Sequence, residues 1–262
     1  MSKTAVITGA TSGMGAAYAK RLAADGHDLI LTGRRQEIIE KLADELKKKR
    51  DVNVNVIIAE LSDDNDIQKV IDAIEATEDI EFLINNAGYS GYKKHFIDAE
   101  TSDYEKMIKV HQIVPMRLIS AVLPQMIRRE KGVIINVSST AAFTPMPEVG
   151  VYGATKSFLR FFSEVLYQEV RDKGIVVQAL CPGYTDTNFG KDYMTEEEFN
   201  KMLSNFKYMT MSPEAVVEYS MRHLKKSKVN CIPGAKNKVM VSFFSSLPRS
   251  LYYKLTAKML EM

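Results

Sequence analysis

The stretch TGATSGMG, Thr8–Gly15, decides the fold, because three glycines follow directly on the apolar run Ala5–Ile7. The residues Lys3–Ile7 are apolar and β-branched, which predicts a short buried strand. Met14–Gly26 has apolar residues at helical spacing and ends on a glycine typical of a helix C-terminus. A glycine-rich turn between a strand and a helix presents free backbone N–H groups and the positive end of the helix at one point. The stretch therefore predicts a phosphate-binding turn, with a tight packing turn as the alternative.

Length and composition are those of one large globular domain. The chain has 262 residues, of which 45% are hydrophobic and 26% charged. A net charge of +2 argues against nucleic acid as the main partner. Cys181 and Cys231 match no metal or disulfide pattern, so we expect no metal site and a reducing, cytoplasmic compartment. We also expect no signal peptide, and no integral membrane segment, because no apolar run approaches the roughly 18 residues that a span needs.

Strand-like and helix-like segments alternate along most of the chain. Further strands are expected at residues 28–33, 52–58, 80–85, 132–139, 175–180 and 228–234, and helices at 36–50, 63–77, 102–129 and 149–173. The third of these helices is expected to begin with a capping box between Ser102 and Glu105. This alternation predicts an α/β fold: a single-domain, Rossmann-type, doubly wound parallel sheet of about seven strands with helices on both faces, spanning residues 1–262. Ligands bind such sheets beyond the carboxyl ends of the strands.

Four more stretches follow later strands at that same edge. They are LINNAGYSG at Leu83–Gly91, INVSST at Ile135–Thr140, YGATK at Tyr152–Lys156 and CPGYTDT at Cys181–Thr187. Together with TGATSGMG, in this order and spacing, they resemble the compact form of the short-chain dehydrogenase/reductase family over roughly residues 3–190. The resemblance implies an oxidoreductase that transfers a hydride between a nicotinamide and a carbonyl or alcohol. It also implies a homodimer or homotetramer.

Tyr152 and Lys156 are candidates for acid–base chemistry, because a separation of four residues places them on one face of a helix. An ammonium beside a phenol favours the phenolate, so we expect Lys156 to lower the pKa of Tyr152 from its usual value of about 10. Tyr152 can then exchange a proton with a substrate oxygen. By resemblance, Ser139, rather than its neighbour Ser138, holds that oxygen, and Lys156 also binds the nicotinamide ribose.

His111 departs from the family pattern, which has an asparagine at this position. In the family the backbone carbonyl of that asparagine holds a water linked to the lysine, and a backbone role tolerates another side chain. We therefore expect activity to be retained, with His111 at the periphery of the site. The alternatives are a part in the proton relay, a titration step near about pH 6–7, or no role in chemistry. His27, His95 and His223 are expected at the surface.

The residues after the second strand bear on the choice of cofactor. NAD-binding members carry an acidic residue there, whereas this chain has Gly33 followed by Arg34 and Arg35. A guanidinium suits a 2′-phosphate, so NADP(H) is expected, with Arg34 on the phosphate, Ser12 assisting, and the other arginine beginning a solvated helix. Glu60 stands where the family has an aspartate that contacts adenine. The expected cofactor-binding residues are Gly9, Thr11, Ser12, Gly13, Met14, Gly15, Arg34, Glu60, Leu61, Asn86, Ala87, Gly88, Tyr152, Lys156, Pro182, Gly183, Thr185 and Thr187.

The segment 188–212 is expected to be a substrate lid within the domain, because it is rich in methionine and aromatic residues and carries a capping box at Thr195–Glu198. Ala142–Pro147 and Tyr89–Phe96 are candidates for the other walls. Such walls favour a bulky apolar ketone or alcohol; we expect a hydroxysteroid, with a 3-oxoacyl reductase as the alternative and a non-catalytic dinucleotide sensor as the alternative of another class. The C-terminal extension 243–262 carries an apolar stripe, Leu247, Leu251, Leu255 and Met259, expected to dock on a second subunit or over the substrate mouth, with a membrane surface as the alternative.

Overall fold

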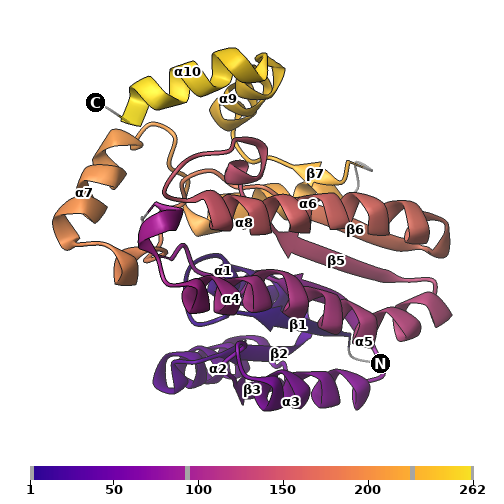
Figure 1. Ribbon diagram of the computed structural model, residues 1–262. Helices are drawn as coiled ribbons and strands as arrows, with labels where there is room; N and C mark the ends of the chain where they lie inside the picture. The colour runs from indigo at the N-terminus through magenta and orange to yellow at the C-terminus, as the bar shows by residue number, and fades with distance from the viewer. Residues whose placement is uncertain (1–2, 92–94, 225–227, 261–262) are drawn as a thin grey trace.

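The computed structural model, which describes residues 3–91, 95–224 and 228–260, contains one parallel sheet of seven strands covered by helices on both faces (Figure 1). The strands are β1 Thr4–Thr8, β2 Asp28–Gly33, β3 Val54–Ile58, β4 Ile80–Asn85, β5 Gly132–Val137, β6 Ile175–Leu180 and β7 Asn230–Cys231. Their order in the sheet is β3-β2-β1-β4-β5-β6-β7, and each neighbouring pair is parallel. The predicted doubly wound fold is confirmed. The direction of winding reverses between β1 and β4, which is where ligands bind such sheets.

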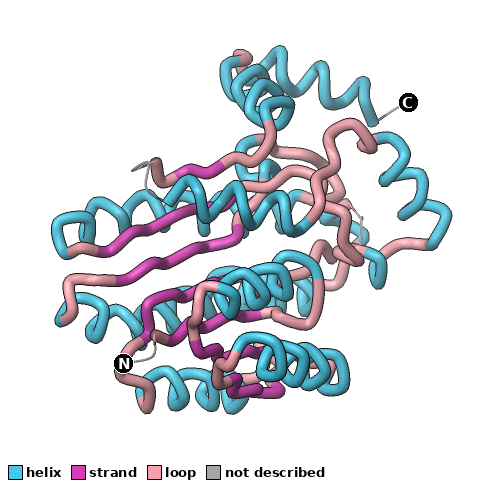
Figure 2. The backbone as a smooth tube through the Cα atoms, turned by 180° about the vertical axis from the view of Figure 1, so that it is seen from behind, coloured by secondary structure: helices cyan, strands magenta, loops and turns pink. Residues whose placement is uncertain are grey.

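Helices cover the sheet in two layers, one on each face, and α7, α9 and α10 lie outside these layers (Figures 1 and 2). The helices that the structure describes are α1 Gly13–Ala24, α2 Gln36–Arg50, α3 Asp64–Glu75, α4 Thr101–Ile108, α5 Val114–Arg128, α6 Gly150–Val170, α7 Glu196–Asn205, α8 Pro213–His223, α9 Ala235–Ser246 and α10 Arg249–Leu260. Buried side chains of α1, α2 and α8 form a first core with one face of the sheet, and those of α3, α5 and α6 form a second core with the other face. Both faces of the central strands are therefore excluded from water.

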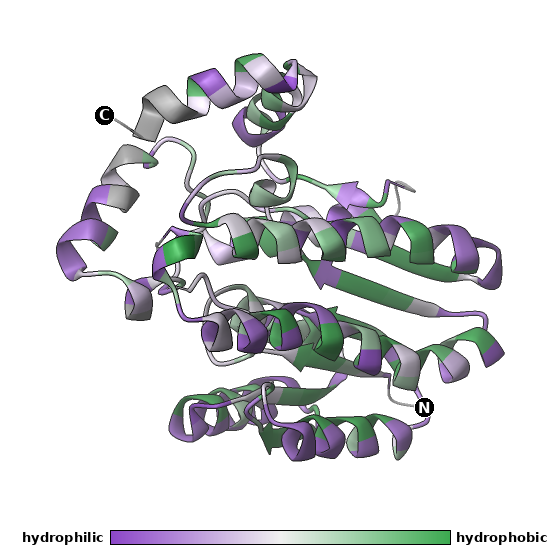
Figure 3. Ribbon diagram, viewed as in Figure 1, coloured by the Kyte–Doolittle hydropathy of each residue, from purple (hydrophilic) through white to green (hydrophobic). Residues whose placement is uncertain are grey.

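Alternation of side chains along β1 supplies both cores. Ala5 and Ile7 pack in the first core and Val6 packs in the second, and all three are fully buried. Full burial of a valine or isoleucine side chain contributes roughly 1.5–3 kcal/mol, which favours continuous apolar residues in strands that are covered on both faces. Figure 3 shows these apolar strands inside helices whose outer faces are hydrophilic.

The helix predicted over residues 102–129 is interrupted. α4 begins at Thr101, and no side-chain hydrogen bond caps it, so the capping box of Ser102 and Glu105 is not formed. Residues Lys109–Ile113 form a π-helical turn before α5 begins. Pro115 accounts for the break, because proline has no N–H to donate to the carbonyl of His111, four residues earlier. Single π-helical turns of this kind are frequent at functional sites.

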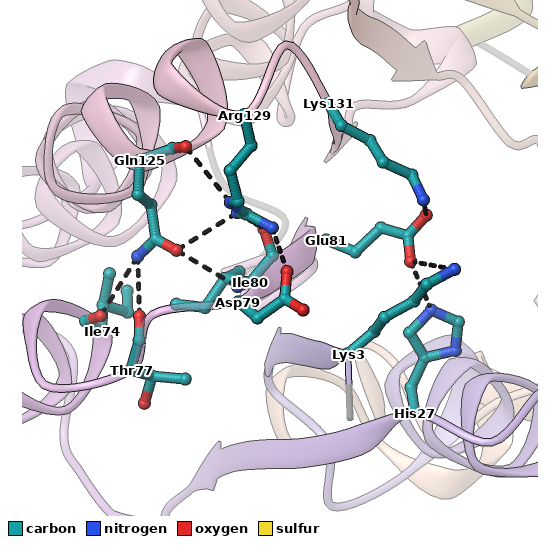
Figure 4. A network of polar contacts seen from close by, with 10 residues as sticks. All are labelled: Lys3, His27, Ile74, Thr77, Asp79, Ile80, Glu81, Gln125, Arg129 and Lys131. Carbon is teal, nitrogen blue, oxygen red and sulfur yellow. Dashed lines mark hydrogen bonds and ion pairs between the residues drawn. The ribbon is translucent and has the colours of Figure 1, made fainter. Parts of the chain in front are cut away.

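A polar network around Glu81 lies at the amino ends of the strands (Figure 4). The Glu81 carboxylate lies 3.2 Å from Lys3 Nζ, 3.0 Å from Lys131 Nζ and 3.3 Å from His27 Nε2. The prediction of a surface His27 was wrong: its side chain is buried and packs edge-on against Phe82. Gly26, at φ +81°, ends α1 and turns the chain, so that the next side chain points inward.

The other two predicted surface histidines lie at or near the surface, whereas the two cysteines are buried. His95 is exposed, and His223 is half-buried and stacks on Tyr219. Cys181, directly after β6, and Cys231, in β7, are both buried free thiols, and the Cys181 N–H donates to the Cys231 carbonyl at 2.7 Å.

Candidate active site

The five sequence stretches meet at the carboxyl edge of the sheet, on the side toward which β5 points in Figure 1. The Thr8 hydroxyl accepts the N–H groups of Asn86 and Ala87, each at 3.0 Å, and so joins the glycine turn to the segment after β4. The Thr140 N–H donates to the Pro182 carbonyl at 2.9 Å, which joins the segments after β5 and β6. Side chains far apart in the sequence are thereby fixed around one site.

The glycine turn is compressed against its neighbours. Gly9 has φ +69°, and a Cβ there would lie 2.9 Å from Ala87 Cα, while a Cβ on Gly15 would lie 2.2 Å from the Gly9 carbonyl oxygen. Gly13, at φ +55°, lies against Thr187, whose Cγ2 would be 2.9 Å from an added Cβ. A side chain at any of these positions would displace backbone or neighbouring atoms. The predicted packing role of the glycines is therefore present together with the geometry of a dinucleotide-binding turn.

The two arginines after β2 contact different groups. Arg34 donates to the Glu60 carboxylate at 3.0 Å. Arg35, expected to belong to the solvated helix, instead donates to the Thr11 and Ser12 hydroxyls at 2.9 and 2.8 Å. Arg35 is the extended residue that caps α2, which directs its side chain back across the glycine turn. Ser12 thus contacts Arg35, and the assignment of Arg34 and Ser12 to the 2′-phosphate stays a prediction.

Several other predicted cofactor residues support this turn. The Asn86 amide donates to the carbonyls of Thr8 and Gly9 at 2.9 and 3.1 Å. Leu61, expected to lie on the adenine ring, is 5% exposed and packs in the second core, so little of its side chain faces outward. Met14 is partly buried against the first core.

The segment after β6 brings the remaining predicted residues to the same edge. The Thr185 hydroxyl donates to the Gly183 carbonyl at 3.2 Å, and the Thr187 hydroxyl donates to the Thr185 carbonyl at 3.4 Å. A Cβ on Gly183 would lie 2.5 Å from the side chain of Asn237, which seats the start of α9 against this segment. Asn237 is buried, and its role was missed at the sequence level.

Tyr152 and Lys156 lie on the first two turns of α6, as predicted. Lys156 is 4% exposed, its Nζ donates to the Val137 carbonyl at 2.9 Å, and it lies 5.8 Å from the centre of the Tyr152 ring. The two serines after β5 have separate contacts. Ser138 is buried and donates to the Lys156 carbonyl at 2.8 Å, whereas Ser139 is hydrogen-bonded with the side chain of Tyr152. Ser139 is therefore the serine that faces the phenol.

The electrostatics of this pair differ from the prediction. Burial raises the pKa of Tyr152 to about 12, and the hydrogen bond with Ser139 only partly offsets that rise. Burial likewise lowers the pKa of Lys156 to about 8. The expected lowering of the Tyr152 pKa by Lys156 is wrong for this structure, because desolvation dominates and Lys156 Nζ bonds to the Val137 carbonyl.

His111 lies in the π-helical turn and is 1% exposed. Its Nε2 accepts the Tyr89 N–H at 3.1 Å, and its Nδ1 lies 2.9 Å from the Thr155 hydroxyl. Burial, and then the charge of Lys156, hold the pKa of His111 well below its usual range. The lowered pKa argues against a titration step near about pH 6–7. The expectation of a peripheral histidine was wrong, because the ring is buried with its centre 5.8 Å from that of Tyr152. The sequence offered one indication of this contact, because Thr155, the partner of His111 Nδ1, lies within the YGATK stretch.

The segment predicted as the lid leaves and re-enters the domain at one place. The Asp186 N–H donates to the Met211 carbonyl at 2.9 Å, and the Met211 N–H donates to the Tyr184 carbonyl at 3.1 Å. Between these points, α7 begins with the predicted capping box, in which Thr195 and Glu198 bond reciprocally. These two hydrogen bonds bring the two ends of the segment together.

Aromatic side chains of the segment lie beside the catalytic residues. The Phe189 ring centre is 6.0 Å from that of Tyr152, and the Tyr193 ring stacks on Tyr89 at 5.5 Å. Tyr184 stacks on Phe206 at 3.9 Å. An apolar wall therefore approaches the reactive phenol.

The C-terminal extension 243–262 contains the end of α9 and all of α10. Tyr252 is 1% exposed, and its hydroxyl donates to the Pro145 carbonyl at 2.7 Å, so α10 is anchored on the predicted wall Ala142–Pro147. Two residues of the predicted apolar stripe, Leu251 and Leu255, are exposed, and the side chain of Met259 lies outside the described residues. Among the helices that the structure describes, none has both the length and the apolarity needed to cross a membrane.

Comparison with known proteins agrees with this geometry. The sequence model of the short chain dehydrogenase family matches residues 3–198. The very-long-chain 3-oxoacyl-CoA reductase of Bos taurus is 32% identical over 97% of this chain and 78% of its own length, and that of Anas platyrhynchos is 35% identical over the same shares. A short-chain dehydrogenase from Sphingobium yanoikuyae, solved in complex with NADPH, superimposes with a TM-score of 0.81 at 29% identity over 94% of this chain and 96% of its own. With Ser139, Tyr152 and Lys156 gathered at one edge of the sheet, these matches show that the chain belongs to the short-chain dehydrogenase family of oxidoreductases.

Proposed function

We propose that the protein reduces the 3-oxo group of a long-chain acyl thioester, with Tyr152 as the proton donor. The observation that carries this proposal is the apolar wall at the phenol, where Phe189 lies against Tyr152 and Tyr193 stacks on Tyr89. An apolar wall favours an acyl chain and excludes water from the reacting carbonyl. The names of the relatives support the acyl substrate over the hydroxysteroid that the sequence suggested first.

The cofactor is NADP(H), whose nicotinamide supplies the hydride when it is bound. The residues of this chain fit that group. The compressed turn at Gly9 and Gly15 leaves no room for side chains beside the backbone. Arg35, held by Thr11 and Ser12, places a guanidinium at the turn, and Arg34 lies close by on Glu60. Two guanidinium groups there suit the 2′-phosphate that distinguishes NADP(H) from NAD(H).

The catalytic side chains act on the substrate oxygen. Ser139 donates a hydrogen bond to that oxygen and orients the carbonyl toward Tyr152. Tyr152 donates its proton as negative charge develops on the oxygen. Burial raises the pKa of Tyr152 to about 12, so the phenol is protonated at neutral pH. Lys156, whose Nζ lies 5.8 Å from the centre of the Tyr152 ring, binds the nicotinamide ribose beside the phenol.

The quaternary structure is proposed to be a homodimer or homotetramer. Phe161 on α6 is 63% exposed, which is unusual for a phenylalanine on a core helix and favours its burial against a second copy. Sedimentation of the wild type and of Phe161→Glu tests this, and a monomeric wild type would contradict it. The predicted cytoplasmic location stays a prediction.

The test of the proposed function follows absorbance at the NADPH band with 3-oxoacyl-CoA thioesters of increasing chain length. Ketosteroids and NADH are assayed in parallel. We expect kcat/KM to rise with acyl length, to exceed that for every ketosteroid, and to be much lower with NADH. Faster turnover of a ketosteroid would favour the hydroxysteroid function. Binding of NADPH without turnover of any substrate would favour the non-catalytic sensor.

A further inference from the structure

His111 joins the segment after β4 to the first turn of α6. We propose that His111 is a positioning residue, which holds the cofactor-facing segment 87–89 and the catalytic tyrosine in register through its two ring nitrogens, as the neutral tautomer protonated on Nδ1. This rests on the proposed function, since it assigns Tyr152 to catalysis and residues 87–89 to the cofactor.

The direction of each hydrogen bond in the chain follows from the groups themselves. The Tyr89 N–H can only donate, so His111 Nε2 must present its lone pair at 3.1 Å. The remaining proton of a neutral imidazole is then on Nδ1, which donates to the Thr155 hydroxyl at 2.9 Å. The Thr155 hydroxyl donates in turn to the Tyr152 carbonyl at 2.8 Å. One continuous chain therefore runs from the backbone of residue 89 to that of residue 152.

The surroundings of the ring oppose any other protonation state. An imidazolium would turn Nε2 into a donor facing the Tyr89 N–H and would lose that bond. The titratable groups around the ring are the Lys156 ammonium and the Tyr152 phenol from α6, and the Tyr89 phenol from the segment after β4. The ammonium repels a second positive charge. Gly88 allows the close approach, because a Cβ there would lie 2.9 Å from His111 Nε2.

The length of the side chain determines which bonds a replacement retains. An asparagine amide reaches about as far as Nδ1 and can donate to Thr155, but it falls short of the Tyr89 N–H. A glutamine amide reaches about as far as Nε2 and can accept from Tyr89, but it bypasses Thr155. The two variants therefore separate the two halves of the chain.

The kinetic experiment compares His111→Asn with His111→Gln. Loss of one hydrogen bond changes an equilibrium or rate by roughly 2–13-fold. We expect His111→Asn to raise the NADPH Kd by about 5-fold with kcat nearly unchanged. We expect His111→Gln to lower kcat by about 5-fold with the NADPH Kd nearly unchanged. Parallel changes in both quantities for the two variants would overturn the proposal, because loss of packing alone predicts no such split.

Thr155→Val tests the middle of the chain. Thr155→Val should lower kcat by about as much as His111→Gln does. The double variant His111→Gln/Thr155→Val should lower kcat by no more than either single variant. Thr77→Val is the matched control, since the Thr77 hydroxyl donates to a helix carbonyl, that of Ala73, at 2.8 Å, in α3 at the opposite edge of the sheet. Additive losses in the double variant, or an equal loss in Thr77→Val, would count against the proposal.

A readout independent of turnover is the ring nitrogen NMR spectrum of the protein without cofactor. The chain has four histidines, and the signals of His111 are those that His111→Asn removes. We expect Nδ1 protonated, Nε2 unprotonated, and no titration between about pH 8 and 5. A proton on Nε2, or titration near the usual pKa, would overturn the proposal. Absence of turnover in the wild type would overturn the proposed function instead, and leaves the NMR result and the NADPH affinities decisive for His111.

Discussion

The two ends of the site differ in their exposure to water. At the cofactor-phosphate end, the side chains of Arg34 and Glu60 are 61% and 41% exposed. At the catalytic end, Lys156 is 4% and His111 is 1% exposed. Water screens an exposed ion pair, whose worth is commonly below about 1 kcal/mol, whereas a buried polar group without its bond costs about 1–3 kcal/mol. The same kind of substitution should therefore have large effects at one end and modest effects at the other.

The largest effect is expected from Tyr152→Phe, at the buried end. Removal of the proton donor should lower kcat by about 10²–10⁴-fold, with the NADPH Kd nearly unchanged. Tyr167→Phe, toward the other end of α6, is the matched control and should retain full turnover. Turnover within a few-fold of wild type in Tyr152→Phe would remove Tyr152 from catalysis.

A second effect at the buried end concerns stability and pH. Burial lowers the pKa of Lys156 to about 8 from 10.5, so between these values the unfolded chain binds more protons than the native protein. The contribution of Lys156 to the free energy of unfolding therefore rises with pH, by about 2 kcal/mol between pH 7.5 and 9.5. Urea unfolding of the cofactor-free wild type and Lys156→Met at both pH values measures the difference. If the two proteins shift equally with pH, Lys156 does not carry a lowered pKa.

The smallest effects are expected at the exposed end, from Arg35→Ala and Arg34→Ala. Arg35 is fixed by two hydroxyls beside the glycine turn, whereas Arg34 is already paired with Glu60. We expect the NADPH Kd to rise by about 10-fold for Arg35→Ala and about 3-fold for Arg34→Ala, with NADH affected less in both. Because salt screens exposed charges, both increases in Kd should be smaller at high salt than at low salt, which titration with NADPH under the two conditions measures. A larger loss in Arg34→Ala would restore the original assignment from the sequence.

Much of the fold could be predicted because it depends on local pattern. The strands at 28–33, 80–85 and 175–180 and the helix at 36–50 have the predicted bounds, since continuous apolar runs and a charged amphipathic helix both have clear periods. The break at 109–113 was missed, although Pro115 was visible, because the apolar pattern continues through it. The inward turn of His27 depends on the geometry of Gly26, which periodicity does not encode.

The candidate site was predictable in its residues and less so in their contacts. The sequence pointed to Tyr152 and Lys156 through their spacing on one helix, and to Ser139 through the family resemblance. Which arginine reaches Ser12 depends on the backbone direction at Arg35, which only the folded chain determines. The high pKa of Tyr152 likewise depends on burial, because a spacing of four residues says nothing about solvent.

The two buried thiols allow opening of the sheet edge at β6 and β7 to be measured by chemical labelling. Burial raises the pKa of both Cys181 and Cys231 to about 12, and a thiol with that pKa is ionised to only about one part in 10⁵ at pH 7. Because the thiolate is the reactive form, alkylating reagents should modify the native protein very slowly. The rate of labelling then reports how often the edge formed by β6 and β7 separates, and that rate can be followed without substrate or cofactor.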